Sequence, residues 1–319
     1  MSMLYISDAV EEVYGRQLDE IAPNWPRFVA RPDGVEPDYG SIEFFYFSGD
    51  IYPSRVRDFA VAALKSENLR WLHTFSAGVD SPFFQTLLGK GVCVSTSSGV
   101  HAVPIAQTVM LYLLALTRDL PGWLGDQSNR IWNPRSIGAL QGLKVGVLGM
   151  GPIGYEITRL CQAMRMDAIA FRRTVRGDEP CPTYGIAELD SHLAEMDVIV
   201  LALPLTPETD RLLGASRLSR VKPGVLIVNV GRGACLDEEA LVCGLESGQV
   251  GGAGLDVFAE EPLPQGSPLW AMSNVIVTPH SSGEELGNHT EATKIFLENV
   301  VRYQEGRSLL NKVPKPESL

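Results

Sequence analysis

Residues 144–154 have the sequence Lys-Val-Gly-Val-Leu-Gly-Met-Gly-Pro-Ile-Gly, in which a short apolar segment runs directly into a glycine-rich turn. The segment Lys144–Leu148 is typical of a buried strand, and residues 153–163 have the composition of a helix. A glycine-rich turn between a strand and a helix is the arrangement that binds the pyrophosphate of a dinucleotide. This order of elements therefore predicts a dinucleotide site, with a purely structural glycine turn as the alternative.

Each residue of the turn has an expected role. Gly149 permits a tight turn, Gly151 lets the backbone approach a pyrophosphate, and Gly154 permits close packing of the helix on the strand. Pro152 suits the first helical turn, where its missing N–H costs nothing. The backbone at Pro152 and Ile153 would then hold the pyrophosphate at the N-terminus of the helix.

The sequence on both sides of the turn alternates between short apolar segments and polar helical ones. This alternation indicates an α/β fold, with parallel sheets wound on both faces by helices. A loop-rich connection is expected at 119–141, a last helix at 288–304 and a frayed tail at 312–316. The expected strands are Leu4–Ser7, Ile42–Phe47, Trp71–Phe75, Val92–Ser95, Lys144–Leu148, Ala168–Phe171, Val198–Leu203, Val225–Val228, Gly254–Val257 and Val275–Thr278.

One helix, expected at Val103–Leu116, is apolar nearly all round, as helices buried on every side are. Two sources of that burial stay open at this point. The helix can lie centrally between two domains, or it can pack against a second subunit. The second source predicts a homodimer.

The composition limits the class of protein. A length of 319 residues suffices for two domains, and 20% charged with 45% hydrophobic residues is typical of globular proteins. The net charge of −11 argues against nucleic acid or an anionic membrane as a partner, and no segment is apolar enough for a transmembrane helix. Residues 1–8 lack the features of a signal peptide, and the five cysteines are scattered. We therefore expect a cytoplasmic protein with reduced thiols and no metal site.

The strand after the glycine turn ends in Phe171-Arg172-Arg173-Thr174, without an acidic residue at its tip. NAD sites usually place an acid about 20 residues after the glycines, where it binds the ribose 2′-hydroxyl. Two guanidinium groups and a hydroxyl suit a 2′-phosphate instead, because arginine binds phosphate in bidentate geometry. The sequence therefore predicts NADP(H) in preference to NAD(H), with a solvated surface pair of arginines as the alternative.

Charged or polar residues follow three successive expected strands: Arg232, Glu261 and His280. Ligands of doubly wound sheets gather at the carboxyl ends of the strands. Taken singly, the three residues could be a surface charge, a solvated acid and a structural histidine. Taken together, they predict a site that binds an anion and transfers a proton.

These motifs together resemble the D-isomer-specific 2-hydroxyacid dehydrogenase family. The resemblance covers about residues 71–283 and implies two doubly wound parallel-sheet domains with a cleft between them. A flavodoxin-like substrate-binding domain would comprise residues 1–99 and 287–319, and a Rossmann dinucleotide-binding domain residues 100–286. The motifs that carry it are Ser76-Ala77-Gly78-Val79-Asp80, the glycine turn, Leu203-Pro204-Leu205-Thr206-Pro207-Glu208-Thr209, Asn229-Val230-Gly231-Arg232-Gly233, Leu255-Asp256-Val257-Phe258 with Glu261-Pro262, and Thr278-Pro279-His280.

The resemblance implies hydride transfer between NADP(H) and a 2-oxo or 2-hydroxy acid. Arg232 would bind the substrate carboxylate and polarise the 2-oxo oxygen, supplying local positive charge against the negative net charge of the chain. His280 would donate a proton to that oxygen, while Glu261 would orient the imidazole and favour its charged form.

The resemblance also implies the residues that surround the two ligands. The backbone amides of Ala77, Gly78 and Val79 would bind the substrate carboxylate, and Asp256 would face the nicotinamide carboxamide. In some members a tryptophan placed like Trp132 reaches the active site of the neighbouring subunit, whereas a surface-packed tryptophan is the default interpretation. The remaining residues expected to line the cofactor are Thr108, Leu203, Pro204, Thr209, Val230, Gly231, Ser282 and Gly283.

Some positions depart from the family pattern, and other functions share the fold. Gln107 replaces a glutamate that many members carry, and Ser281 with Ser282 makes the pocket edge more polar. One alternative is a nucleotide-sensing, corepressor-like interaction protein, which turnover would exclude. Another is a phosphite- or formate-type dehydrogenase. Glu261 argues against the formate type, which has glutamine there, and the arginine pair argues against NAD-linked phosphite oxidation.

Overall fold

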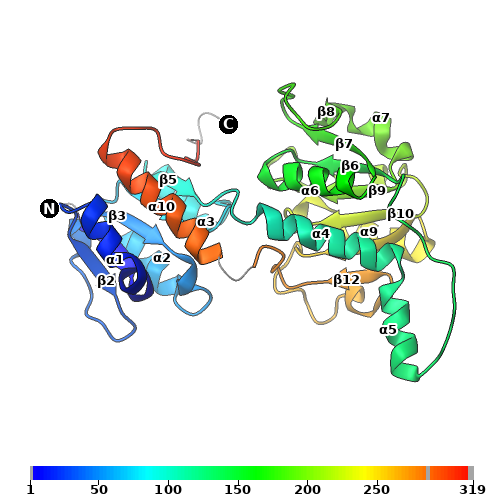
Figure 1. Ribbon diagram of the computed structural model, residues 1–319, viewed down its shortest axis with the longest axis horizontal. Coiled ribbons are helices and arrows are strands. Elements are labelled where there is room, and N and C mark those ends of the chain that lie inside the picture. The colour runs from blue at the N-terminus through cyan, green and yellow to red at the C-terminus, as the bar shows by residue number, and fades with distance from the viewer. Residues whose placement is uncertain (1–2, 285–287, 315–319) are drawn as a thin grey trace. The chain divides into compact units, whose positions relative to one another are not determined.

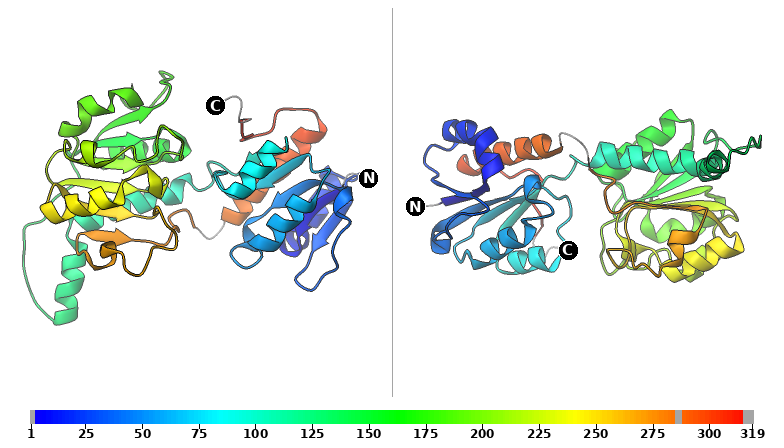
Figure 2. Two further views of the ribbon diagram at one scale, coloured as in Figure 1. Left: turned by 180° about the vertical axis from the view of Figure 1, so that it is seen from behind. Right: turned by 90° about the horizontal axis from the view of Figure 1, so that it is seen from below.

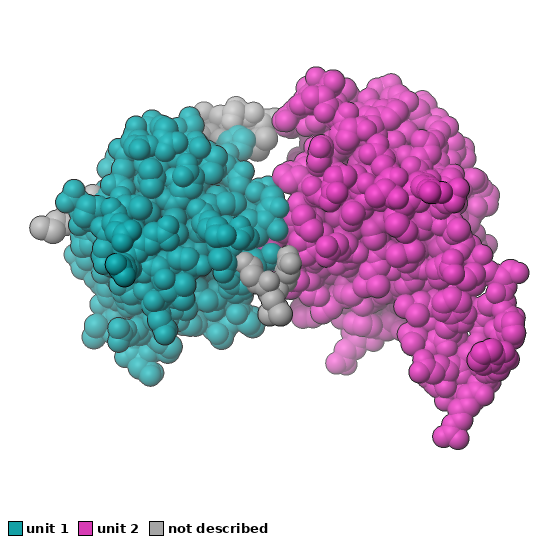
Figure 3. All heavy atoms as spheres, viewed as in Figure 1, with its two compact units in different colours: residues 1–100, 285–319 teal, residues 101–284 magenta. Residues whose placement is uncertain are grey.

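The computed structural model describes residues 3–284 and 288–314 of the chain. These residues form two compact units, coloured separately in Figure 3. Unit 1 comprises Met1–Val100 and Glu285–Leu319, and unit 2 comprises His101–Glu284. The domain limits predicted from the sequence fall after residues 99 and 286.

Unit 1 contains a five-stranded sheet in the order β2-β1-β3-β4-β5, with every pairing parallel. This is the strand order of flavodoxin-like folds. Its elements, most of them labelled in Figure 1, are β1 (Met3–Ser7), α1 (Asp8–Ile21), β2 (Arg27–Ala30), β3 (Ile42–Phe47), α2 (Val56–Lys65), β4 (Trp71–Thr74), α3 (Pro82–Gly89), β5 (Cys93–Thr96) and α10 (Asn288–Gln304).

Successive side chains of β1 point to opposite faces of this sheet, as they must in any strand. Leu4 and Ile6 pack with α1 and with Phe296 of α10. Tyr5, between them, packs on the other face with Phe59 of α2 and the rest of that cluster. The five strands are therefore apolar on both faces, which is typical of parallel sheets covered by helices.

Unit 2 contains a seven-stranded parallel sheet in the order β12-β11-β10-β9-β6-β7-β8. Counted from β6, this is the Rossmann order continued by one more strand. Its elements are α4 (Ala102–Thr117), α5 (Leu120–Asn129), β6 (Lys144–Leu148), α6 (Pro152–Ala163), β7 (Asp167–Arg172), β8 (Thr183–Gly185), α7 (Leu189–His192), β9 (Val198–Leu201), α8 (Ala215–Leu218), β10 (Val225–Asn229), α9 (Glu238–Ser247), β11 (Val250–Leu255) and β12 (Val275–Val277).

Two helical layers cover the sheet of unit 2. Helices α4 and α6 lie side by side on one face, where they bury Val145 and Val147 of β6 (Figure 1). Helix α9 lies on the opposite face, visible in the right-hand view of Figure 2, and packs in the cluster that contains Leu148. The predicted α/β class with two doubly wound parallel sheets is confirmed.

Three features of local structure differ from the sequence-based predictions. Residues 119–141 do not form loop throughout, because α5 begins with Pro121 in its first turn and is capped by the Asp119 side chain. Strand β11 lies at Val250–Leu255 rather than 254–257. Its glycines resemble a turn, but a Cβ on Gly254 would come within 2.6 Å of Tyr112, so close packing of α4 on the sheet requires glycine there. Strands β2 and β8 were not expected at all, since both are short and only partly buried.

The tail is ordered as far as the structure describes it. The Val313 N–H donates to the Val94 carbonyl over 2.9 Å, and the backbone of Lys312 forms an isolated antiparallel β-bridge with Ser95. The frayed tail predicted from residue 312 is therefore wrong for residues 312 and 313, whereas residues 315 and 316 lie outside the described part.

Helix α4 is buried on one side only in the single chain. Tyr112 and Leu113 are buried, but Leu111 is 57% and Leu114 39% exposed. Burial on every side is therefore not achieved within one chain, and the homodimer stays a prediction. No single helix in the described part of the chain is long and apolar enough to cross a membrane. Helices α4 and α5 meet that test only as a pair bent by 61°.

Candidate active site

The glycine turn between β6 and α6 combines two crowded positions with one open position. Gly149 has φ +105°, and a Cβ there would lie 2.4 Å from the Ala202 carbonyl oxygen. A Cβ on Gly154 would lie 1.9 Å from the Gly149 carbonyl oxygen. At Gly151, by contrast, a Cβ would meet nothing within 4 Å in the described structure. Gly149 and Gly154 shape the turn, and Gly151 leaves room beside it.

The open position lies at the start of α6. Gly151 is the N-cap residue and has no side chain to accept hydrogen bonds from the first helical amides. These amides and the helix dipole attract anions. The turn therefore fits the pyrophosphate of a dinucleotide, which would occupy the space that a side chain at residue 151 would take.

The predicted arginines lie at the tip of β7, beside an acid, Glu179, that was not predicted from the sequence. The Arg172 Nη1 donates to Glu179 Oε1 over 2.7 Å, and the Arg172 side chain is only 16% exposed. Arg173 and Thr174 are exposed. The positive charge of Arg173 contributes to lowering the pKa of Glu208, after hydrogen bonds from Thr206 and the backbone. The two guanidinium groups thus have different surroundings.

The loop after β9 is held by its own threonine. The Thr209 hydroxyl donates to the Pro204 carbonyl over 2.7 Å and accepts from the Thr206 N–H over 2.8 Å. Leu203 is almost fully buried at the start of this loop. This loop therefore keeps a fixed course past the end of β9.

The turn that carries Arg232 is built around a buried asparagine. Asn229, the last residue of β10, accepts from the Gly231 N–H over 3.1 Å and donates to the Arg232 carbonyl over 3.0 Å. The Arg232 Nη1 donates to the Gly231 carbonyl over 2.7 Å. A Cβ on Gly233 would come within 1.8 Å of the Phe258 backbone, so the Arg232 turn lies directly against the segment after β11.

That segment carries Glu261, which is paired with His280. Glu261 Oε2 lies 2.8 Å from His280 Nδ1, and Glu261 Oε1 accepts from the Phe258 N–H over 3.0 Å. One carboxylate oxygen is thus fixed by backbone, and the other faces the imidazole. The His280 side chain is 51% exposed, so the imidazole is open to solvent. This is the geometry of an oriented proton donor or acceptor.

Asp256 organises the backbone around His280. His280 has φ +52°, a backbone conformation that residues other than glycine seldom adopt. Its N–H donates to the Asp256 carbonyl over 2.8 Å. The Asp256 carboxylate, 1% exposed as a residue, accepts from the Thr278 hydroxyl and from the amides of Ser281 and Ser282. Residues on both sides of His280 are therefore anchored to one buried carboxylate.

Helix α4 is tied to the same turn. The Thr108 hydroxyl donates to the Ser282 carbonyl over 3.3 Å, and the Gly283 carbonyl lies 3.1 Å from His101 Nδ1. The Tyr112 hydroxyl bonds to Thr278. The structure therefore brings Thr108, Asp256, Ser282 and Gly283 together.

The turn after β4 in unit 1 has a distinct backbone pattern. The Ser76 hydroxyl donates to the Gly78 carbonyl over 3.0 Å, and the Gln85 amide donates to the Val79 carbonyl over 2.9 Å. Within residues 3–284 and 288–314, the N–H groups of Ala77, Gly78 and Val79 donate to no acceptor. Adjacent unbonded amides of this kind attract anions.

Four contributors to the site were not predicted as site residues: Asn229, Tyr112, Thr278 and Glu179. Asn229 and Thr278 nevertheless lie in two of the sequence motifs quoted above. Asn229 carried a signal, because an amide at a strand end just before a glycine-flanked arginine suits a turn. Tyr112 and Glu179 carried none, since their partners are distant or lie in an irregular loop.

The comparisons with known proteins identify the family of the chain. Residues 110–282, more than half of the chain, match the family model for the NAD binding domain of D-isomer specific 2-hydroxyacid dehydrogenases. The chain therefore belongs to the D-isomer specific 2-hydroxyacid dehydrogenase family, a class of oxidoreductases.

Among curated relatives, glyoxylate/hydroxypyruvate reductase B of Pectobacterium carotovorum is 32% identical over 237 residues, 71% of each protein. A D-isomer specific 2-hydroxyacid dehydrogenase of Xanthobacter autotrophicus Py2, solved with NADPH and MES, is 29% identical with a TM-score of 0.80, covering 100% of this chain and 99% of that one. An NADPH-dependent glyoxylate/hydroxypyruvate reductase of Sinorhizobium meliloti, solved with NADP and sulfate, is 26% identical with a TM-score of 0.81, covering 99% of both. The chain spans about half the length of some relatives, such as 48% of an archaeal D-3-phosphoglycerate dehydrogenase.

Proposed function

We propose that this chain is an NADP(H)-dependent D-2-hydroxyacid dehydrogenase that works as a 2-oxo acid reductase. The observation that carries the proposal is the Glu261–His280 pair, with 2.8 Å between Oε2 and Nδ1. An Nδ1–H that donates to the carboxylate fixes the ring and leaves Nε2 to exchange a proton with substrate. Arg232, in the turn packed against the same segment, supplies a cation for the substrate carboxylate.

The proposed mechanism assigns one task to each residue. Arg232 binds the substrate carboxylate and polarises the 2-oxo oxygen. A nicotinamide cofactor, when bound, would supply the hydride. His280 Nε2 donates its proton to the 2-oxo oxygen as the C–O double bond becomes single, and Glu261 holds the ring in place. In the reverse direction, neutral His280 accepts the hydroxyl proton.

Cofactor binding is assigned to the carboxyl edge of the unit 2 sheet. The open Gly151 position and the uncapped start of α6 support a pyrophosphate there. Arg173 and Thr174, exposed after β7, support a 2′-phosphate. Two neighbours crystallised with NADPH or NADP give this preference further support. The Asp256 carboxylate serves the His280 turn, and contact with the nicotinamide carboxamide is proposed for the same residue.

Substrate binding is proposed to use Ala77, Gly78 and Val79 of unit 1 besides Arg232 and His280. Their amides suit a carboxylate, which is common to all 2-oxo acids. Glyoxylate and hydroxypyruvate are the first substrates to test, because relatives carry those names. A homodimer is proposed from the exposed apolar side chains Leu111 and Leu114 of α4.

The test follows NADPH and NADH absorbance separately against 2-oxo acids from glyoxylate to phenylpyruvate. We expect turnover with NADPH, and we expect His280→Gln to abolish it while NADPH still binds. Protein that binds NADPH but turns over no acid with either cofactor would overturn the proposal and favour a nucleotide-sensing role. Turnover with NADH alone would leave the reaction in place and remove the NADP assignment.

A further inference from the structure

The loop between β7 and β8 contains a carboxylate that is almost wholly enclosed. The Glu179 side chain is 4% exposed, although the surrounding residues 173–178 are exposed. Glu179 Oε1 accepts from Arg172 Nη1 over 2.7 Å and from the Arg176 N–H over 2.8 Å, and Oε2 accepts from the Gly177 N–H over 2.8 Å. The loop is therefore folded around this one acid.

The acid is negatively charged at every physiological pH. Hydrogen bonds from the Arg176 backbone, with help from Arg172 and Gly177, lower the pKa of Glu179 to about 2 against the opposing effect of burial. Its charge and that of Arg172 offset each other. In this fold, the ribose whose 2′ position distinguishes NAD from NADP lies at the tip of β7. This tip thus has less net positive charge than its two arginines suggest.

We propose that Glu179 is a specificity-determining residue that opposes 2′-phosphate binding by occupying the Arg172 guanidinium. The proposal rests on the proposed use of NADP(H) at this site. Selectivity for the phosphate then depends mainly on Arg173 and Thr174. The chain keeps an acid near the ribose, as NAD sites do, but supplies it from the following loop instead of the strand tip.

Two opposing effects of Glu179 decide whether it favours or opposes binding of a 2′-phosphate. It restrains Arg172, which helps a bound phosphate, and it repels the phosphate charge. Arg172 is only 16% exposed, so surrounding atoms restrain much of its side chain even without Glu179. A phosphate on the remaining edge of the guanidinium lies much closer to the carboxylate than the Debye length at low salt, about 30 Å at 0.01 M, so repulsion reaches it almost unscreened there. Repulsion therefore outweighs restraint.

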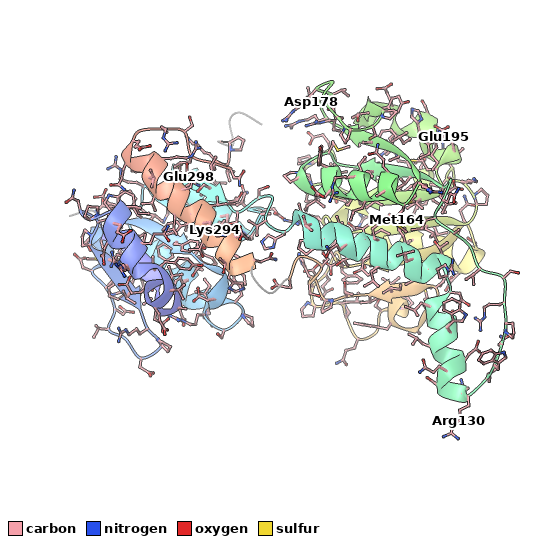
Figure 4. All side chains as sticks on the ribbon, in the orientation of Figure 1. Arg130, Met164, Asp178, Glu195, Lys294 and Glu298 are labelled. Atoms are coloured by element: carbon pink, nitrogen blue, oxygen red, sulfur yellow. The ribbon has the colours of Figure 1, made fainter. Side chains whose placement is uncertain are left out.

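The test compares two ligands that differ by the phosphate alone, adenosine 2′,5′-bisphosphate and adenosine 5′-monophosphate, by calorimetric titration without turnover. Glu179→Gln is expected to raise the ratio of the affinity for the bisphosphate to that for the monophosphate. The expected rise is about fivefold to tenfold at low ionic strength, and less at high salt. Taking a ratio cancels any change of the loop that affects both ligands equally. Asp178→Asn is the matched control, because Asp178, labelled in Figure 4, is an exposed acid on the same loop. Because the Asp178 carboxylate is exposed and acts through water, whereas that of Glu179 is enclosed, Asp178→Asn should change the ratio less than twofold.

A second variant covers the case in which Glu179→Gln loses binding of both ligands. Arg172→Ala leaves Glu179 uncompensated and should lower the ratio, and Arg172→Ala combined with Glu179→Gln should restore it to within about threefold of wild type. A ratio that falls or stays constant in Glu179→Gln, or stays low in the double variant, overturns the proposal. If the wild type shows no preference for the bisphosphate, the NADP assignment fails, yet the rise in Glu179→Gln is still expected.

Discussion

Gly151→Ala should separate cofactor binding from folding more cleanly than any other change in the glycine turn. The residue has φ −83° and ψ −170°, which alanine adopts without strain, and a Cβ there meets nothing within 4 Å in the described structure. Alanine lowers the entropy of the unfolded chain, which stabilises by about 0.4–1 kcal/mol. It is a poorer N-cap than glycine, which offsets this gain. The free energy of unfolding should therefore change by less than about 1 kcal/mol.

The same methyl group takes the space proposed for the pyrophosphate. It would keep the phosphate oxygens from the first amides of α6. Losing one or two charge-assisted hydrogen bonds, each roughly 1.5–3 kcal/mol, costs about 1.5–6 kcal/mol, and the middle of that range is about 2–4 kcal/mol. That is about a 30-fold to 1,000-fold rise in the Kd for NADPH.

Gly154→Ala is the matched control, because its Cβ would lie 1.9 Å from the Gly149 carbonyl oxygen. The helix or the turn must move to accommodate it, and overpacking of this kind costs about 1–3 kcal/mol or more. Thermal unfolding and fluorescence titration with NADPH measure both quantities for each variant. The reasoning is refuted if Gly151→Ala binds NADPH within twofold of wild type, or if it lowers Tm as much as Gly154→Ala does.

Three further predictions concern other parts of the chain. Arg232→Lys should keep the charge but lose bidentate binding, so kcat/KM for a 2-oxo acid should fall about 100-fold while the Kd for NADPH stays within threefold; an unchanged KM and kcat would remove Arg232 from the site. Asp256→Asn should lower kcat at least about tenfold, because an amide cannot accept all the bonds that hold the His280 turn; full activity would show that the anchor is dispensable. Burial lowers the pKa of His73 to about 3, so the unfolded chain takes up a proton that the folded chain refuses as pH falls from 6.5 toward 3, and stability is lost over that range. In urea titrations, His73→Gln should reduce this slope by up to about 1.4 kcal/mol per pH unit, and an unchanged slope would contradict the assignment.

The sequence predicts most of the fold because its strands are apolar on both faces. Segments such as Ile42–Phe47 are nearly continuously apolar, which is typical of strands in the middle of a parallel sheet covered on both faces. The glycine turn is predictable for a related reason, since its spacing reflects a backbone geometry that few other residues allow. The order of Arg232, Glu261 and His280 after successive strands also brings them to one edge, because β10, β11 and β12 are neighbours.

Other features depend on contacts that no local pattern records. Gly254 in β11 is explained only by Tyr112 of α4, more than a hundred residues earlier. Helix α5 contains one proline and two glycines in ten residues, which suits a loop, and its Asp119 cap is visible only with coordinates. The pairing of Arg172 with Glu179 likewise needs the course of an irregular loop, so the sequence places two equivalent arginines where the structure has two different ones.

The path of the chain through unit 1 has a consequence for its synthesis. Phe296 stacks on Tyr46 at 4.1 Å between ring centroids, and residues 311–313 cover the outer edge of β5, so the last part of the chain completes a sheet begun by the first. All of unit 2 is translated before these residues emerge from the ribosome. Until then, one apolar face and one strand edge of unit 1 stay uncovered, and both are sites where nascent chains aggregate. The cofactor-binding half is therefore expected to finish folding first, although it comes second in the sequence.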